Sequence, residues 1–221
     1  MKRIAALLIC LITSAACLAG CAGSDEAFTQ RSYTADGGQI TEVRIEVRDR
    51  QIEVIPSDDN QIHIDYFDNS KEYYDISVSD GQVLTMSAAS NKDWKDYIGG
   101  KSAAGSRKIS LQLPGTHLAA LKVSTTNEDI SLSALDMIGD ISLSSQGGGI
   151  FFDQLNAGNS ILLNAKNGDI LGTIIGSYDD YAISCDIKKG ESSLPADKKS
   201  GTKMLAAAVN NGDIEIEFIS D

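Results

Sequence analysis

The chain has 221 residues, 42% of them hydrophobic, and its 31 acidic and 19 basic side chains give a formal net charge of −12 at pH 7. It is long enough to bury a core in one domain or in two small ones. Its acidity opposes contact with phosphate backbones and with anionic lipid headgroups, and it argues against nucleic acid as a partner.

The first residues follow the pattern of a bacterial lipoprotein signal. Lys2 and Arg3 precede an apolar run from Ile4 to about Ala16, which is short for a transmembrane helix. Leu18-Ala19-Gly20-Cys21 then resembles a lipobox, which implies cleavage before Cys21 and a lipid on its thiol. The sequence therefore predicts a signal peptide over residues 1–20 and a mature chain held by Cys21 at a membrane, outside the cytoplasm. An ordinary secretory signal with an unrelated cysteine is the alternative.

Cysteine usage predicts a mature chain without an internal disulfide. Cys10 and Cys17 would leave with the signal and Cys21 would carry lipid, so that only Cys185 remains. Cys185 follows Ala182-Ile183-Ser184 in a predicted strand, and we expect it to pack as a small core residue rather than act as a reactive thiol.

Residues 21–38 are polar and rich in small residues, and we expect a flexible tether there. From Gln39 onward apolar and polar residues alternate, as in strands with one wet face. The alternating sets are Val43, Ile45 and Val47; Ile62, Ile64 and Tyr66; and Tyr74, Ile76 and Val78. Residues 87–107 are less regular and predict a long loop, alone or with a helical turn. Its Trp94 and Tyr97 are candidates for interface anchors or for core plugs.

The second half of the chain repeats every 20 residues. Four apolar columns share this register: Ile130, Ile150 and Ile170; Leu135, Leu155 and Ile175; Leu121, Ile141, Ile161 and Tyr181; and Val123, Leu143, Leu163 and Ile183. Ile109-Ser110-Leu111 resembles the unit upstream, and Asn211-Gly212-Asp213-Ile214 restates it downstream, after a loop at about residues 188–202.

A fixed period with two short strands per unit is typical of a β-solenoid. The predicted fold is therefore all-β: a parallel β-solenoid over residues 39–220, with coils of 20 residues and with the N-terminal strands continuing or capping it. Stacked coils would bring equivalent residues to about 4.8 Å from one another. An antiparallel meander is the alternative, because Asn-Gly between alternating apolar residues is a strong hairpin signal. Hairpins, however, have no need for a constant register.

The turns carry a family resemblance. Asn127-Glu128-Asp129-Ile130, Asn167-Gly168-Asp169-Ile170 and Asn211-Gly212-Asp213-Ile214 are similar to the turns of the bacterial "putative adhesin" family, domain of unknown function 4097. The resemblance covers residues 39–220, and Gly147-Gly148-Gly149 departs from it by lacking both Asn and Asp. It implies a β-rich domain outside the cytoplasm and carries over no catalytic residue.

Few side chains offer catalytic or metal chemistry. His63 and Asp65 share a strand face and could form a weak metal pair, but a solvated face explains them better, and His117 is remote in sequence. Ser200-Gly201-Thr202-Lys203 has the Ser-x-x-Lys spacing of serine acyl-enzymes, without the helix that this chemistry needs.

Calcium is the best chemical alternative, because several aspartates lie near turns and calcium prefers oxygen ligands. They are Asp129, Asp140, Asp153, Asp169, Asp179, Asp180 and Asp213. Capping of the bends is the better explanation, because the 20-residue period differs from the nine-residue calcium-binding repeat.

The sequence predicts no catalytic residue, no metal site and no cofactor. The predicted function is a non-enzymatic lipoprotein of the cell envelope, which binds a protein or a glycan at the surface. The alternative is an envelope sensor or assembly factor that modulates a membrane protein complex.

Overall fold

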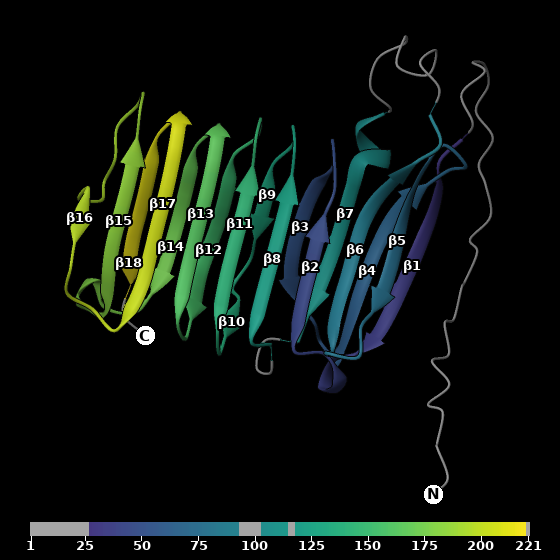
Figure 1. Ribbon diagram of the computed structural model, residues 1–221, viewed down its shortest axis with the longest axis horizontal. Coiled ribbons are helices and arrows are strands. Elements are labelled where there is room, and N and C mark those ends of the chain that lie inside the picture. Colours follow the sequence, from purple (N-terminus) through teal and green to yellow (C-terminus); the bar gives the residue numbers. More distant parts are fainter. Residues whose placement is uncertain (1–26, 93–102, 115–117, 220–221) are drawn as a thin grey trace, which may run out of the picture.

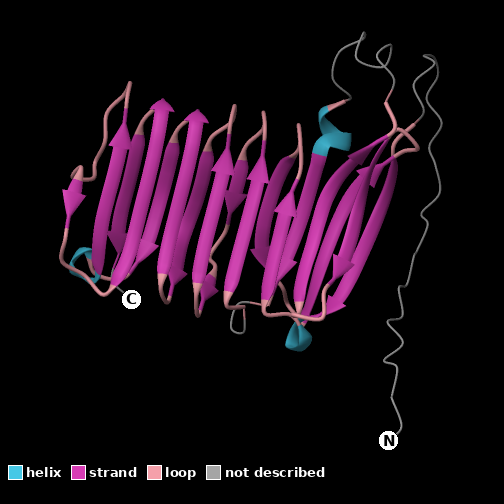
Figure 2. Cartoon of the chain, viewed as in Figure 1, coloured by secondary structure: helices cyan, strands magenta, loops and turns pink. Residues whose placement is uncertain are grey.

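The computed structural model describes residues 27–92, 103–114 and 118–219. In these residues the strands form two sheets of nine strands each, which lie against one another along the whole length of the body (Figures 1 and 2). The prediction of an all-β, solenoid-like fold with parallel sheets is confirmed.

Neighbouring strands in the middle of each sheet run parallel, whereas antiparallel pairs occur at the two ends of the sheets. The first sheet runs, in spatial order, β1 (Thr29–Asp36), β4 (Gln61–Asp68), β7 (Lys108–Leu113), β3 (Gln51–Pro56), β9 (Ile130–Leu132), β12 (Ile150–Ala157), β14 (Ile170–Ile175) and β18 (Ile214–Ile219), with β10 (Asp136–Met137) paired to β12. The second runs β16 (Asp197–Lys198), β15 (Tyr181–Ile187), β17 (Lys203–Asn211), β13 (Ser160–Asn167), β11 (Asp140–Ser145), β8 (Ala120–Thr125), β2 (Glu42–Glu46), β6 (Val83–Ser90) and β5 (Glu72–Val78). The parallel pairs exclude the antiparallel meander.

The helices of the described residues are single 3-10 turns: η1 (Gly37–Gln39), η3 (Ala104–Arg107) and η4 (Tyr178–Asp180). None of the helices in this part of the chain has the length and apolar character needed to cross a membrane.

The core lies between the two sheets and is built from rows of apolar residues that cross the strands. One row of the first sheet is Ile109, Ile52, Ile130, Ile150, Ile170 and Ile214, and all six are fully buried. A facing row of the second sheet is Leu84, Val43, Leu121, Ile141, Ile161, Leu205 and Ile183. Within residues 27–92, 103–114 and 118–219, the buried hydrophobic side chains all fall between Ala35 and Ile216, so a chain that begins at residue 22 keeps every one of them.

The 20-residue register holds in the middle of the body and fails in three of the four predicted columns. Leu155 pairs with Ile174 rather than Ile175, because the register of β12 shifts between Phe152 and Leu155, where Gln154 has a φ of +51°. Tyr181 pairs with Lys203, and Leu205 takes the place beside Ile161 that the sequence assigned to Tyr181.

Ile183 is displaced for the same reason. It pairs with Leu205, whereas Ala207 takes the place beside Leu163 that the sequence assigned to Ile183. Both errors arise because β17 lies between β13 and β15, so that β15 does not stack directly on the preceding unit.

Each end of the body is built out of chain order. At the N-terminal end β2 and β3 lie inside β6 and β7, which follow them in the sequence, and at the C-terminal end β17 lies inside the earlier β15. The prediction of a flexible tether over residues 21–38 is wrong in part. Residues Thr29–Asp36 form β1, which pairs along its whole length with β4. Residues 21–26 of that segment lie outside the described residues.

The corners after the second-sheet strands stack so closely that glycine is required. A Cβ built on Gly212 would lie 2.5 Å from the carbonyl oxygen of Gly168, and Gly212 also has a φ of +144°, which glycine adopts at little cost. A Cβ added to Gly148, Gly168 or Gly190 would likewise overlap backbone atoms of the neighbouring corner. Close stacking therefore also explains the Gly147-Gly148-Gly149 corner, where the family motif is missing.

Candidate functional site

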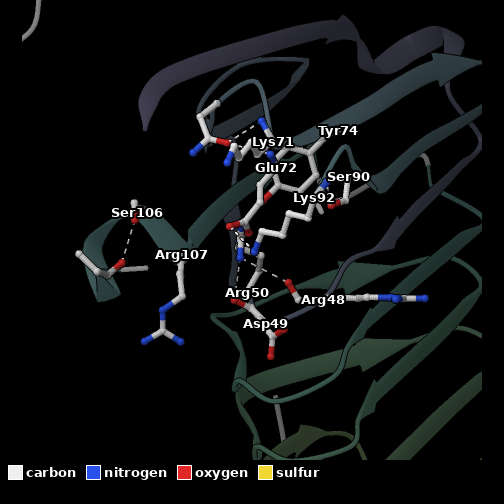
Figure 3. A network of polar contacts seen from close by, with 12 residues as sticks. Arg48, Asp49, Arg50, Lys71, Glu72, Tyr74, Ser90, Lys92, Ser106 and Arg107 are labelled. Atoms are coloured by element: carbon white, nitrogen blue, oxygen red, sulfur yellow. Dashed lines mark hydrogen bonds and ion pairs between the residues drawn. The ribbon is translucent and has the colours of Figure 1, made fainter. Parts of the chain in front are cut away.

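A polar pocket of about 350 Å³ lies at the N-terminal end of the body, where β5 and β6 meet the corner between β2 and β3 (Figure 3). It is lined by Arg48, Asp49, Arg50, Glu72, Tyr73, Tyr74, Ala88, Ala89, Ser90 and Lys92. Its volume falls within the range of small-ligand pockets. Three basic and two acidic side chains line it, in a chain whose overall charge is strongly negative.

Arg50 is the fixed centre of this pocket. Its side chain is 5% exposed; Nε donates to the Tyr74 hydroxyl at 2.6 Å and Nη2 donates to Glu72 Oε2 at 2.7 Å. Nη1 donates to the carbonyl oxygens of Asp49 at 3.1 Å and Arg48 at 3.5 Å. Burial alone would lower the pKa of Arg50, but the Tyr74 oxygen and the Glu72 carboxylate hold it above its ordinary value. The guanidinium is therefore charged and held on three sides.

Glu72 joins Arg50 to Lys92. Its Oε1 lies 2.7 Å from Lys92 Nζ, and both side chains are about one-fifth exposed. Burial raises the pKa of Glu72, but the bonds with Lys92 and Arg50 outweigh it and leave this pKa below its ordinary value. The carboxylate is thus ionised at neutral pH and is engaged through both of its oxygens.

Aromatic rings pack beside Arg50 and Tyr74 in this site. Tyr74 meets Tyr66 edge to face, with 5.2 Å between the ring centroids, and the Phe28 ring centroid lies 5.8 Å from Arg50 Cζ. Burial raises the pKa of Tyr74 above its ordinary value, so its hydroxyl stays protonated while it accepts the bond from Arg50 Nε.

The corner that presents Arg48 and Arg50 is itself bonded to the next corner. Asp49 has a φ of +53°, which Asp tolerates better than most residues, and its carboxylate accepts from Asn127 Nδ2 at 2.6 Å. Thr125 Oγ1 donates to the Arg50 carbonyl at 2.8 Å. The basic side chains therefore project from a backbone with little freedom to move.

The Glu72 network makes stability depend on pH in a defined direction. A carboxyl whose folded pKa is lowered stabilises the fold above its unfolded pKa, and this contribution is lost as pH falls through the folded pKa. We expect Glu72→Gln to lower the free energy of unfolding by about 2 kcal/mol at pH 7. The difference from the unmodified chain should shrink as pH falls below about 4.5, in urea unfolding series at pH 7, 5 and 3.

Glu215→Gln is the matched control, because Glu215 is exposed on β18. It should cost less than about 0.5 kcal/mol at every pH. A Glu72→Gln difference that stays constant from pH 7 to pH 3 would show that the network does not act through ionised Glu72.

The predicted histidine pair takes a different partner. His63 lies on β4, but its Nε2 meets Asp59 Oδ1 at 3.1 Å, and Asp65 accepts instead from the Ser32 hydroxyl. The backbone N–H of Gln61, with Ser57 and His63, holds the pKa of Asp59 below its ordinary value. Among the described residues no three His, Cys, Asp or Glu side chains gather as a metal site would require.

The turn aspartates bond to the adjoining chain. Asp129, Asp169 and Asp213 accept backbone N–H groups of Gly149, Asp213 and Glu191 at 2.8 to 2.9 Å. Asp140 and Asp153 accept hydroxyl groups 20 residues further on, from Ser160 and Thr173, and Asp180 accepts the N–H of Ser177. Asp179 donates its own backbone N–H to Ser177 Oγ. Capping of the bends therefore accounts for Asp129, Asp169, Asp180 and Asp213. Asp140 and Asp153 instead bond to side chains of the neighbouring strand, and Asp179 takes part through its backbone.

The remaining candidates are separated or lie outside the described part. Lys203 Nζ donates to Asn156 rather than to Ser200, and Cys185 Sγ lies half-buried at 3.2 Å from Ser192 Oγ. Cys21, Trp94, Tyr97 and His117 fall outside the described residues.

A second surface lies on the outer face of the second sheet, over strands β11, β13, β17 and β15. Leu162 on β13 and Met204 on β17 are exposed there, by 38% and 47%. Beside them a shallow groove of about 410 Å³ follows β11, β13, β17 and β15, where short side chains such as Ser144, Ala206 and Ala208 face outward. Exposed apolar side chains framed by polar ones are typical of interaction surfaces.

Sequence reasoning missed the Arg50 pocket. Its three segments, residues 48–50, 72–74 and 88–92, are distant in the sequence, and no regular spacing relates them. The one local signal is Arg48-Asp49-Arg50, which places two cations in the corner between β2 and β3.

The amino-acid sequence matches a known family and the fold matches a solved structure. Residues 40–220 match the model of a family described as Toastrack DUF4097. A "putative cell adhesion protein" from Clostridium sporogenes has a similar structure, with a TM-score of 0.63 at 10% identity, over 87% of this chain and 100% of that one. This likeness shows a shared fold.

Two further structures align less well. "Putative adhesins" from Bacteroides fragilis and Parabacteroides distasonis have TM-scores of 0.37 and 0.31, at 11% and 15% identity. The alignments cover 86% and 89% of this chain, and 97% and 95% of theirs. None of the curated proteins compared with the chain matches it significantly.

Proposed function

Because the chain belongs to the Toastrack DUF4097 family, as its match over residues 40–220 shows, we propose that it is a non-enzymatic, surface-binding module of the cell envelope. In this proposal a lipid on Cys21 holds it at a membrane, outside the cytoplasm. The solved structure from Clostridium sporogenes that shares its architecture is described as a "putative cell adhesion protein", which supports a binding role.

The observation that carries the binding role is the outer face of the second sheet. Strands β11, β13, β15 and β17 pair in register, so this face is broad and rigid. Its short polar side chains and its two exposed apolar ones, Leu162 and Met204, offer contact area to a protein or a glycan. A stiff face loses little conformational entropy when a partner binds.

Crosslinking in intact cells tests this role. We expect the tagged, lipidated chain to capture an envelope protein or a glycan, and Met204→Arg to reduce the yield at least fivefold because it places a charge on the contact face. Glu215→Arg, a charge change on the exposed face of the other sheet, is the control and should leave the yield unchanged. Equal yields from both variants would contradict the assignment of this face. A single integral membrane protein captured equally by both would favour a modulator of a membrane complex.

The anchor makes a separate prediction. In cells fed an alkyne fatty acid, the chain should take up label, Cys21→Ala should abolish it, and Cys17→Ala should leave it unchanged because Cys17 is removed with the signal. Gel fluorescence after click coupling measures the label. Persistence of the label in Cys21→Ala would exclude this cysteine as the attachment point.

A further inference from the structure

The Arg50 pocket lies at the corner of the body from which the membrane anchor leaves. Phe28 contacts Arg50, and β1 begins at Thr29 beside the ends of β4 and β5 (Figure 1). Seven residue steps separate Phe28 from Cys21, and a fully extended chain of that length spans at most about 25 Å. This step rests on the lipid anchor of the proposed function, which would keep the pocket within that distance of the headgroups.

The local charge of this corner differs from that of the whole chain. Three basic side chains line the pocket against two carboxylates, and both carboxylates are engaged, Glu72 by Arg50 and Lys92, and Asp49 by Asn127. At physiological salt, charges further away than about 8 Å are largely screened. The nearest side chains, rather than the net charge of −12, therefore decide how this corner meets an anionic surface.

The pocket supplies donors suited to phosphate. The Arg50 guanidinium is engaged in internal bonds and positions its neighbours. Lys92 Nζ is paired with Glu72 at 2.7 Å, but its side chain is 23% exposed and can reach a phosphate at the pocket opening. The exposed Arg48 side chain extends away from Glu72 (Figure 3). Lysine and arginine are the usual partners of phosphate oxygens, and the pocket volume of about 350 Å³ admits a phosphoglycerol group.

We propose that this pocket receives the phosphate of an anionic phospholipid headgroup, with Lys92 as the inner cation and Arg48 at the rim. Docking would fix the anchored body by its β5–β6 corner. The face around Leu162 and Met204 would then stay clear of the docking site, because β11, β8 and β2 lie between β13 and β6 in the same sheet.

Vesicle co-sedimentation tests the docking without using the anchor. The probe is the chain beginning at residue 22, which keeps the whole core, mixed with vesicles of phosphatidylcholine alone or with 30% phosphatidylglycerol. We expect binding only to the anionic vesicles, at low salt, and a drop of about fivefold in the partition coefficient for Arg48→Ala, the usual effect of one basic residue near a charged surface. Lys199→Ala, a change at the opposite end where the side chain is 88% exposed, should stay within twofold.

Equal binding to neutral and anionic vesicles would overturn the proposal, and so would an equal loss of vesicle binding in Arg48→Ala and Lys199→Ala. A third contradicting outcome is a chain that binds free glycerol 3-phosphate but binds neither kind of vesicle. The last result would assign the pocket to a soluble ligand. Since no lipid on Cys21 is needed in this assay, its result is independent of the fatty-acid labelling, and either one can fail alone.

Discussion

Gly212→Ala is expected to lower the free energy of unfolding by about 3 kcal/mol, which combines the strain of a non-glycine residue at positive φ with overpacking of a close contact. The backbone of Gly212 has a φ of +144°, and its missing Cβ would lie 2.5 Å from the Gly168 carbonyl oxygen and 2.8 Å from Asp169 Oδ1. Because the atoms it would meet include backbone, no side-chain rotation relieves the clash. The two corners would have to separate, and Asp169 would lose its bond to the Asp213 N–H.

Gly105→Ala is the matched control, since nothing lies within 4 Å of the Cβ position at Gly105 and its φ is not positive. This change should be neutral or slightly stabilising. Chemical denaturation of both variants, followed by far-UV circular dichroism, measures the difference. Similar midpoints for the two variants would mean that the corners can open at little cost, and that glycine there does not serve close stacking.

Ile170→Ala should cost about 3 kcal/mol, and lower the melting temperature by roughly 6–12 °C, because it removes a fully buried side chain from the middle of a core row. Ile170 stacks between Ile150 and Ile214, and the rigid pairing of β12, β14 and β18 prevents the sheets from collapsing into the gap. The cavity therefore remains, and its cost adds to the lost transfer free energy.

The same substitution at an exposed site separates burial from residue type. Ile138 is 61% exposed in the turn before β11, so Ile138→Ala should cost less than about 0.5 kcal/mol. Differential scanning calorimetry of the two variants decides the comparison. If Ile170→Ala melted within 2 °C of Ile138→Ala, the predicted rigidity of the row would be wrong.

The middle of the fold could be predicted from the sequence because its signal is local and repeated. A constant spacing of 20 residues predicts the pairing of Ile130, Ile150 and Ile170, and the turn residues between them indicate the corners. The spacing identifies equivalent positions, but it does not say which of them are neighbours. Ile109 and Ile52 fit the same row, yet the order Ile109, Ile52, Ile130 follows from packing between distant segments.

Single inserted residues and long connections between strands explain why the other parts of the fold could not be predicted from the sequence. One extra residue near Gln154 moves Ile174 into the row where the sequence placed Ile175. The pocket was beyond reach for a related reason: Arg50, Glu72 and Lys92 converge only because β5 and β6 fold back beside β2. No periodicity encodes that return. In contrast, Asp129, Asp169 and Asp213 precede repeated strands, and they accept backbone N–H groups at the corners as the prediction of capped bends requires.

The placement of β17 inside β15 has a consequence for how the domain assembles. In an ordinary repeat array each unit can form on the one before it, and the terminal units fray independently. Here β15 has no partner on its inner side until residues 203–211 arrive as β17. β18 then follows and adds the edge strand of the first sheet. A chain interrupted before that point would leave the long edge of β13 open to aggregation. Folding should therefore be slow and all-or-none, with completion only after the whole chain is available.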